Sequence, residues 1–163
     1  MAKRKYAQSL FMAEPEKTGA FYQLLPLLDE SPQFLFDFGK ALSKQGKFVE
    51  SNRILTRGSL ISCDPMFYVI QGNNYKDLAD YEMAERYYLK AFHILPNRLY
   101  PLYCMMRLYE DMDDVKKKRL AAQQVLDFQA KVDSPAIMEM KNYARKIIMQ
   151  DGQQQFIYHD ILN

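Results

Sequence analysis

Apolar and small side chains recur three to four positions apart through the middle of this chain, and the whole pattern then returns at a nearly constant interval. The clearest copy covers residues 64–97, and its regularly spaced positions are Tyr68, Gly72, Tyr75, Tyr81, Ala84, Tyr88, Ala91 and Pro96. A spacing of three or four places side chains on one face of an α-helix. The segment therefore predicts two amphipathic helices, the second of which ends at a proline.

The same pattern precedes this segment in FLFDFGKALSKQGKFVESNRIL, where Gly39 and Phe48 precede Gly72 and Tyr81 by the same interval. Glycine and alanine allow two helices to approach to about 8–10 Å, and the aromatic side chains fill the space above and below. We therefore expect Gly72 and Ala84 to face each other across the helix pair.

A third copy follows in LYCMMRLYEDMDDVKKKRLAAQQVL, with the interval lengthened by one inserted residue, so that Met106 corresponds to Gly72. Met106 thus occupies the small position, and Lys118 stands where alanine is expected. We expect this pair to be looser than the others. Its second helix is expected to start late and to use Ala121 and Ala122 for the close contact.

Both ends of the chain predict further helices. Residues 3–30 indicate a degenerate helical pair whose second helix opens at Pro15, with an apolar stripe of Phe11, Tyr22, Leu24, Leu25 and Leu28. Near the other end, Ser134 and Pro135 form a helix start signal. The following segment to Gln150 carries one apolar face and predicts a helix that covers the last helix pair. The final DGQQQFIYHDILN indicates a frayed tail or a short docking segment.

These positions match the tetratricopeptide repeat (TPR), and the chain resembles that family. The resemblance implies an all-α fold, a right-handed α-solenoid of antiparallel helix pairs with a C-terminal capping helix. We expect a single TPR-like domain over residues 1–150: a degenerate pair at 3–30, repeats at about 32–64, 65–98 and 99–131, and a capping helix at 134–150. Residues 151–163 form the tail. The architecture itself predicts a binding scaffold rather than a catalyst.

Composition agrees with this prediction. The chain has 163 residues, few prolines and glycines, 12 tyrosines, 10 phenylalanines and no tryptophan, which suits nearly all-helical packing. A net charge of +2 gives no general attraction to nucleic acid. No run of about 18 apolar residues indicates a membrane span, and the broken apolar stretch at the start is a poor signal peptide.

Residues with catalytic or metal-binding chemistry stand alone. His93 and His159 lack carboxylate partners at ligand spacing, so packing or surface roles are expected. Cys63 and Cys104 have no metal-site spacing, and we expect two buried free thiols. The basic run at residues 116–119 indicates a solvated helix face, with a patch for an anionic partner as the alternative. No enzyme activity, metal or cofactor is therefore predicted.

In a TPR-like fold the first helices of successive repeats line a concave groove. Counting from the regular positions, the predicted groove-binding residues are Phe36, Lys40, Lys44, Asn73, Lys76, Tyr100, Tyr103 and Arg107. Cations beside aromatic rings suit an acidic or C-terminal peptide. The alternative is an ordinary exposed helix face, which carries lysine and arginine in any case.

The carboxylate clamp of chaperone-binding TPR proteins requires lysine and asparagine in one repeat, asparagine in the next, and lysine with arginine in the third. The matching places here hold Phe36, Lys40, Ile70, Tyr100 and Cys104. This departure argues against a co-factor that binds chaperone tails.

A narrower resemblance rests on SPQFLFDFGKALSKQGKFVESNRIL, ISCDPMFYVIQGNNY, ILPNRLYPLY and SPAIMEMKNYARKII. Over most of residues 5–148 the chain resembles the soluble C-terminal TPR region of Bacteroides-type O-antigen ligase/polymerase-like membrane proteins. That resemblance implies a non-catalytic accessory module in cell-surface polysaccharide assembly. The membrane-embedded catalytic part has no counterpart in the sequence, so transferase activity is not implied.

The predicted function is a protein–protein interaction scaffold with a protein or peptide partner, acidic if the groove lysines engage it, and with no nucleic-acid partner. The alternative is a module that binds glycans or small ligands through the aromatic and basic groove. As a stand-alone protein it is expected in the cytoplasm. As part of, or associated with, a membrane protein, it is expected at the cell envelope. The sequence leaves the oligomeric state open.

Overall fold

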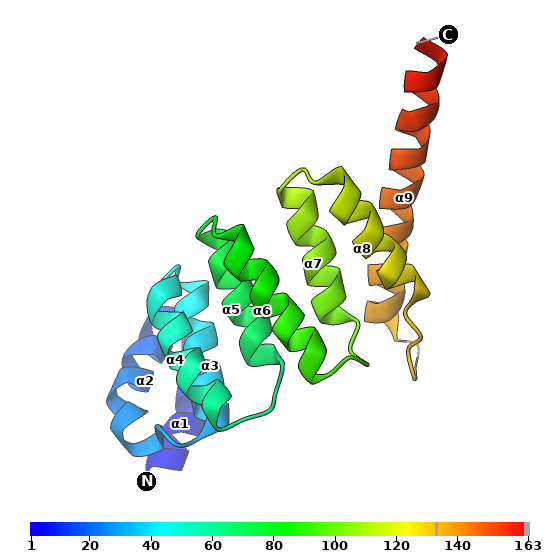
Figure 1. Cartoon of the computed structure of the whole chain (residues 1–163). Helices are drawn as coiled ribbons and strands as arrows, with labels where there is room; N and C mark the ends of the chain where they lie inside the picture. The colour runs from blue at the N-terminus through cyan, green and yellow to red at the C-terminus, as the bar shows by residue number, and fades with distance from the viewer. Residues whose placement is uncertain (133, 162–163) are drawn as a thin grey trace. The chain divides into compact units, whose positions relative to one another are not determined.

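The computed structural model describes residues 1–132 and 134–161, and it describes side chains for residues 1–132 and 134–150. Within these ranges all regular secondary structure is α-helical (Figure 1). The helices are α1 (Ala2–Ser9), α2 (Glu14–Leu28), α3 (Pro32–Lys44), α4 (Phe48–Leu60), α5 (Met66–Asp77), α6 (Tyr81–Ile94), α7 (Tyr100–Asp111), α8 (Val115–Asp127) and α9 (Pro135–Ile161). The chain divides into two compact units, Met1–Ile94 and Leu95–Asn163.

The first unit contains α1 to α6, in which α3 packs with α4 and α5 packs with α6 (Figure 1). Its aromatic core joins α2 to α3. The ring centroid of Phe21 lies 5.5 Å from those of both Phe34 and Phe38, edge-on in each case, and all three side chains are fully buried. As predicted, Pro15 stands in the first turn of α2. Phe11, by contrast, was wrongly placed in the apolar stripe, because its side chain is 92% exposed.

Three turns that join the helices of a pair share one geometry. Gly46, Ala79 and Asp113 occupy equivalent places in successive pairs, and they have positive φ angles of 74°, 60° and 54°. The residue after each one donates its backbone N–H to a carbonyl five positions earlier, as in Lys47 N to Leu42 O at 3.0 Å. This is the Schellman motif, which ends a helix in a left-handed residue. Only the first of the three turns uses glycine, the residue that adopts this conformation without strain.

Glycines also mark the close helix approaches. A Cβ atom at Gly39 would lie 2.5 Å from the side chain of Leu55, and one at Gly72 would lie 2.5 Å from the ring of Tyr88. The three atoms nearest to that position at Gly72 all belong to Tyr88, and the expected facing of Gly72 and Ala84 stays a prediction. Ala84 is fully buried one helical turn before Tyr88 on α6. The ring of Tyr88 thus lies against the space that glycine leaves on α5.

A buried polar network that was not predicted joins α3, α4 and α5. The Asn74 side chain is fully buried. Its Nδ2 donates to Ser51 Oγ at 2.8 Å and to Asn52 Oδ1 at 2.7 Å, while its Oδ1 accepts from Ser43 Oγ at 2.6 Å. Ser51 in turn donates to the carbonyl of Gly39 at 2.7 Å. All four polar side chains thus find partners, as burial requires.

In the second unit α8 packs against both α7 and α9 (Figure 1). Helix α8 begins at Val115, which corresponds to Tyr81 at the start of α6, so the predicted late start is wrong. Ala122 is fully buried and Ala121 is 5% exposed. Their close contact with the preceding helix stays a prediction. The basic run at residues 116–119 lies in the first turns of α8.

Helix α9 continues to Ile161, whereas the sequence predicted its end at Gln150. No proline interrupts residues 151–161, so the backbone can continue the helix into the predicted tail. The tail side chains, His159 included, lie outside the side chains that the structure describes. Over the described residues, Ala144 and Ile147 form the buried side of α9. The predicted single domain over residues 1–150 stays a prediction.

Other expectations concern membrane spans and thiols. Among the described residues no helix is both long and apolar enough to cross a membrane. Cys104 is buried, as expected, but Cys63 is exposed because it lies in the loop after α4, so the prediction of two buried thiols is half wrong. His93 lies exposed near the end of α6.

Candidate ligand-binding faces of the two units

The eight predicted groove residues divide between the units. Phe36, Lys40, Lys44, Asn73 and Lys76 lie on α3 and α5 of the first unit, and Tyr100, Tyr103 and Arg107 lie on α7 of the second. Each set is a separate candidate face, with its own neighbours and its own chemistry.

On the first unit, the α3 face surrounds a pocket of about 210 Å³. The pocket is lined by Leu10, Glu14, Lys17, Asp37, Lys40, Ala41 and Lys44. Lys40 is exposed and forms no ion pair with a described residue. The face therefore offers one unengaged ammonium group beside two carboxylates and two further lysines.

Glu14 organises the charges of this pocket. Its Oε1 lies 3.1 Å from Lys44 Nζ and 3.3 Å from Lys17 Nζ. Burial acts to raise the pKa of Glu14, but the hydrogen bonds and charges of the two lysines outweigh it, so the pKa lies below its ordinary value. Its Oε2 is buried without a hydrogen-bond partner among the described residues.

Two predicted residues of the first unit have packing partners instead. Phe36 lies edge-on to Phe67, with ring centroids 5.3 Å apart, and belongs to the contact between α3 and α5. Asn73 accepts a hydrogen bond from the hydroxyl of Tyr88 at 2.6 Å. Lys76 lies partly buried in the last turn of α5. Lys40 and Lys44 are thus the predicted residues of this unit that the structure brings together at a pocket.

On the second unit, a cluster of aromatic and charged side chains connects α7 to α9. The Arg107 guanidinium carbon lies 4.8 Å from the ring centroid of Tyr143, and Arg107 Nε lies 3.0 Å from Glu110 Oε2. The Tyr143 hydroxyl contacts both carboxylate oxygens of Glu110, at 2.9 and 2.7 Å. Tyr103 packs edge-on against Tyr143 with centroids 5.9 Å apart. Two of the predicted residues therefore already hold α9 in place.

A pocket of about 540 Å³ lies beside this cluster. It is lined by Tyr103, Pro135, Met138, Glu139, Asn142, Tyr143 and Lys146. All of these except Tyr103 come from α9 and were missed, because that helix was predicted to be a cap with one buried face. The spacing of Met138, Asn142 and Lys146, four positions apart, is the signal that could have identified a second face of the helix.

Tyr100 and Tyr103 stack at 6.5 Å with an interplanar angle of 23°. The negative charge of the neighbouring Cys104 thiolate is the largest cause that raises the pKa of Tyr100 to about 12, and burial is the next. Tyr100 therefore stays neutral at physiological pH, and its 39% exposed side chain offers a stacking surface and a hydroxyl.

The described residues contain no group of three or more His, Cys, Asp or Glu side chains that could hold a metal ion. The candidate faces on both units consist of lysine, arginine, carboxylate and tyrosine side chains, which can offer a ligand charge, hydrogen bonds and ring stacking.

No protein-family model matches the chain, and no curated protein does. Solved structures do resemble it. A crystal structure of MamA is 13% identical, covers 90% of this chain and 91% of its own, and gives a TM-score of 0.64. The MamA RS-1 ArsTM double mutant is 14% identical over 92% of this chain and 96% of its own, with a TM-score of 0.68. The Sgt2 TPR domain from Aspergillus fumigatus is 15% identical over 75% and 82%, with a TM-score of 0.58. These similarities confirm the all-α, TPR-like fold.

Proposed function

We propose that this chain is a non-catalytic scaffold that binds a protein or peptide partner. The TPR-like fold supports a role in protein interaction in general. The observation that carries the proposal is the α3 face. There Lys40, which is exposed and has no ion-pair partner within the described part of the chain, stands beside the Lys44–Glu14–Lys17 cluster at one pocket. In this proposal an acidic side chain of the partner pairs with Lys40.

The test compares two substitutions that reverse one charge each. Lys40→Glu changes the α3 face, and Lys116→Glu changes the exposed first turn of α8. Both are surface changes expected to shift stability by no more than about 0.5 kcal/mol. In pull-downs from the native cell extract, we expect Lys40→Glu alone to lose the partner, and added salt to weaken capture by the parent. Equal capture by both variants rejects the α3 face.

The proposed cellular role is an accessory module in cell-surface polysaccharide assembly. Its support is the sequence resemblance to the TPR region of O-antigen ligase/polymerase-like membrane proteins over most of residues 5–148. Mass spectrometry of the partner crosslinked to the parent chain tests this role. We expect a membrane protein of glycan assembly, and a partner unconnected with the envelope rejects this part of the proposal while leaving the scaffold function intact.

Glycan binding is the second candidate, and the pocket beside Tyr103 and Tyr143 favours it, because tyrosine rings and amide or charged groups line one space of about 540 Å³. A glycan depends on ring contact rather than on charge. Tyr100→Leu removes an exposed ring beside the cluster without touching the bonds of Tyr143. Calorimetric titration with envelope oligosaccharides should lose its signal in this variant and keep it in Lys40→Glu.

A further inference from the structure

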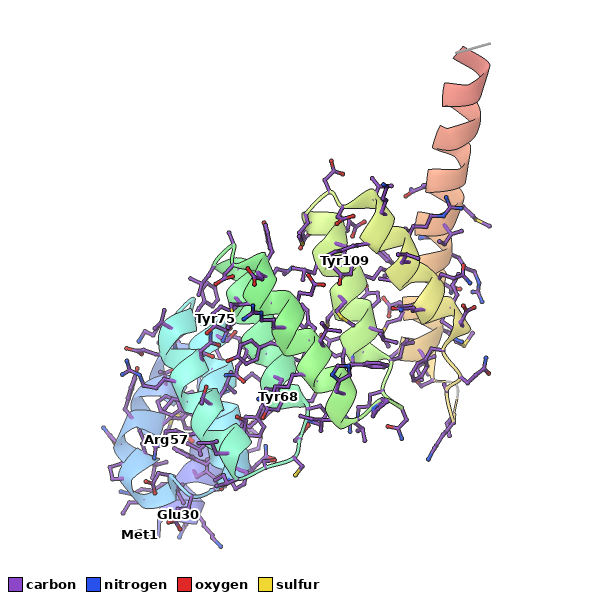
Figure 2. All side chains as sticks on the ribbon, in the orientation of Figure 1. Met1, Glu30, Arg57, Tyr68, Tyr75 and Tyr109 are labelled. Carbon is purple, nitrogen blue, oxygen red and sulfur yellow. The ribbon has the colours of Figure 1, made fainter. Side chains whose placement is uncertain are left out.

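We propose that the first unit carries a second ligand site, which binds a carboxylate-bearing peptide segment with a neighbouring aliphatic side chain. The site is the α4–α5 groove, a pocket of about 470 Å³ lined by Val49, Asn52, Arg53, Thr56, Arg57, Tyr75 and Leu78. None of these residues belongs to the predicted groove set, so the site goes beyond the function proposed for the α3 face. Arg57 and Tyr75 are labelled in Figure 2.

Two arginines give the groove its charge. Arg53 and Arg57 stand four positions apart and therefore share one face of α4. Arg57 Nη2 lies 3.0 Å from Asp29 Oδ2, and both side chains are more than 40% exposed, so water screens this pair. Arg53 is exposed and has no ion-pair partner among the described residues. A guanidinium group that lacks a carboxylate partner and lies beside a second guanidinium group favours an anionic ligand. Such a ligand can accept hydrogen bonds from two N–H donors.

The floor of the groove supplies a further oriented donor. Gln71, whose side chain is 1% exposed, donates from Nε2 to Thr56 Oγ1 at 2.9 Å. Since the Thr56 oxygen already accepts this bond, its own hydroxyl hydrogen is available to a ligand on the open side of the groove. Asn52 is held beneath by its bond from Asn74, so the floor is fixed by the buried network.

The buried Gln71 Oε1 atom has no donor among the described residues. Because this atom is buried and Gln71 does not line the pocket, it is not open to a ligand, and the group that the floor offers is the Thr56 hydroxyl. A peptide carboxylate accepts hydrogen bonds from this hydroxyl and from the guanidinium groups, as the oxygens of inorganic phosphate also can. The apolar side chains of Val49 and Leu78 at the rim favour a peptide segment over a small anion.

Apolar walls define the rest of the ligand. Val49 is 66% exposed and Leu78 is 44% exposed, both at the rim. The ring of Tyr75 is fixed by stacking on Tyr87 with centroids 5.1 Å apart. An aliphatic side chain next to the ligand carboxylate buries against Val49 and Leu78, and this burial adds affinity that a charged contact alone lacks.

The experiment uses the full chain and a fluorescein-labelled peptide in which glutamate and leucine alternate, with binding followed by fluorescence anisotropy. The control peptide has glutamine in place of every glutamate. Two groove variants, Arg53→Gln and Thr56→Val, are compared with Lys116→Gln, which removes one positive charge from an exposed helix elsewhere. Circular dichroism confirms that each variant keeps its helices.

Arg53→Gln should weaken binding about tenfold, as expected for loss of a charge-assisted hydrogen bond. Thr56→Val should weaken it about threefold to tenfold, and Lys116→Gln should leave it within about twofold of the parent. The glutamine peptide should bind no variant well.

Other outcomes overturn the proposal. Absence of binding to the parent, or equal weakening by Arg53→Gln and Lys116→Gln, shows that the groove is not a specific site. Displacement of the peptide by inorganic phosphate at comparable concentration assigns the groove to a free anion. Loss of binding in Lys40→Glu, with Arg53→Gln unaffected, places the peptide on the α3 face. That result supports the proposed function while rejecting this second site.

Discussion

Replacing Gly72 by alanine should destabilise the protein, although the same substitution in a helix is ordinarily favourable. Alanine in place of glycine stabilises a helix interior by about 0.5–1 kcal/mol. At Gly72, however, the new Cβ atom would lie 2.5 Å from Cε1 and 2.7 Å from Cδ1 of Tyr88. The Tyr88 ring is 1% exposed and its hydroxyl bonds to Asn73, so it cannot move aside freely. Overpacking of this kind costs about 1–3 kcal/mol.

Gly19 provides the matched control, because it also lies within a helix, α2, and a Cβ atom there would meet nothing within 4 Å. Gly19→Ala should therefore show the helix gain of about 0.5–1 kcal/mol alone. Subtracting the change in the free energy of unfolding of one variant from that of the other cancels the gain in helix propensity that both share. It isolates the steric cost at Tyr88, about 1–3 kcal/mol in the free energy of unfolding.

Urea unfolding followed by far-ultraviolet circular dichroism measures this difference. The slope of the free energy against urea must agree among the parent and both variants for the comparison to hold. A Gly72→Ala variant as stable as Gly19→Ala refutes the reasoning, since the ring of Tyr88 would then not lie against Gly72. Adding Tyr88→Leu to each variant checks the cause, because the penalty at Gly72 should shrink when the ring is absent.

Four further predictions concern other parts of the fold. Glu14→Gln should lower stability at neutral pH by less than about 1 kcal/mol. Because the folded pKa of Glu14 lies below its ordinary 4.5, this contribution is present above that value and is lost as the pH falls through the folded pKa, so urea titrations of parent and variant should converge in acid. Asn74→Ala should cost about 1–3 kcal/mol in the same assay, because it leaves buried partners unbonded. Ala79→Gly should stabilise the protein by about 0.5–1 kcal/mol by relieving its φ of 60°. Deleting the chain from Ser134 onward should expose the α8 side that α9 covers and cause self-association in analytical ultracentrifugation. A monodisperse and equally stable truncated chain contradicts that expectation.

The repeat pattern predicted the helices well because it reflects packing within one pair. Gly39 and Gly72 each lie against a side chain of the following helix, and the interval between them is therefore a structural constraint visible in the sequence. The turns recur at the same interval, but the sequence does not indicate the second and third of them. Ala79 and Asp113 adopt the left-handed conformation there, and neither is glycine. Their strain is offset by the Schellman hydrogen bonds, which composition does not reveal.

The ligand-binding face was harder to predict than the fold. The position of a residue on a predicted helix indicates the direction of its side chain. It does not indicate which neighbouring side chains already occupy that space. Phe36 and Asn73 were assigned to the groove by counting, and both contact other helices of their own unit. The buried network around Asn74 was missed for the same reason. Polar residues at helical spacing indicate an exposed helix face, and the packing of α5 against α3 and α4, which buries them, is not visible in the sequence.

The two candidate faces differ in what a ligand must displace. On α7, Arg107 and Tyr103 are engaged by Tyr143, which also bonds to Glu110, so a ligand that needed these groups would have to break contacts within the second unit. On α3, Lys40 has no such partner among the residues that the structure describes, and a ligand carboxylate can pair with it without loss of a described bond. Because binding free energy is the surplus after displaced contacts are subtracted, a charged partner gains more on the first unit. The second unit favours a ligand that fits beside Tyr143 rather than one that replaces it.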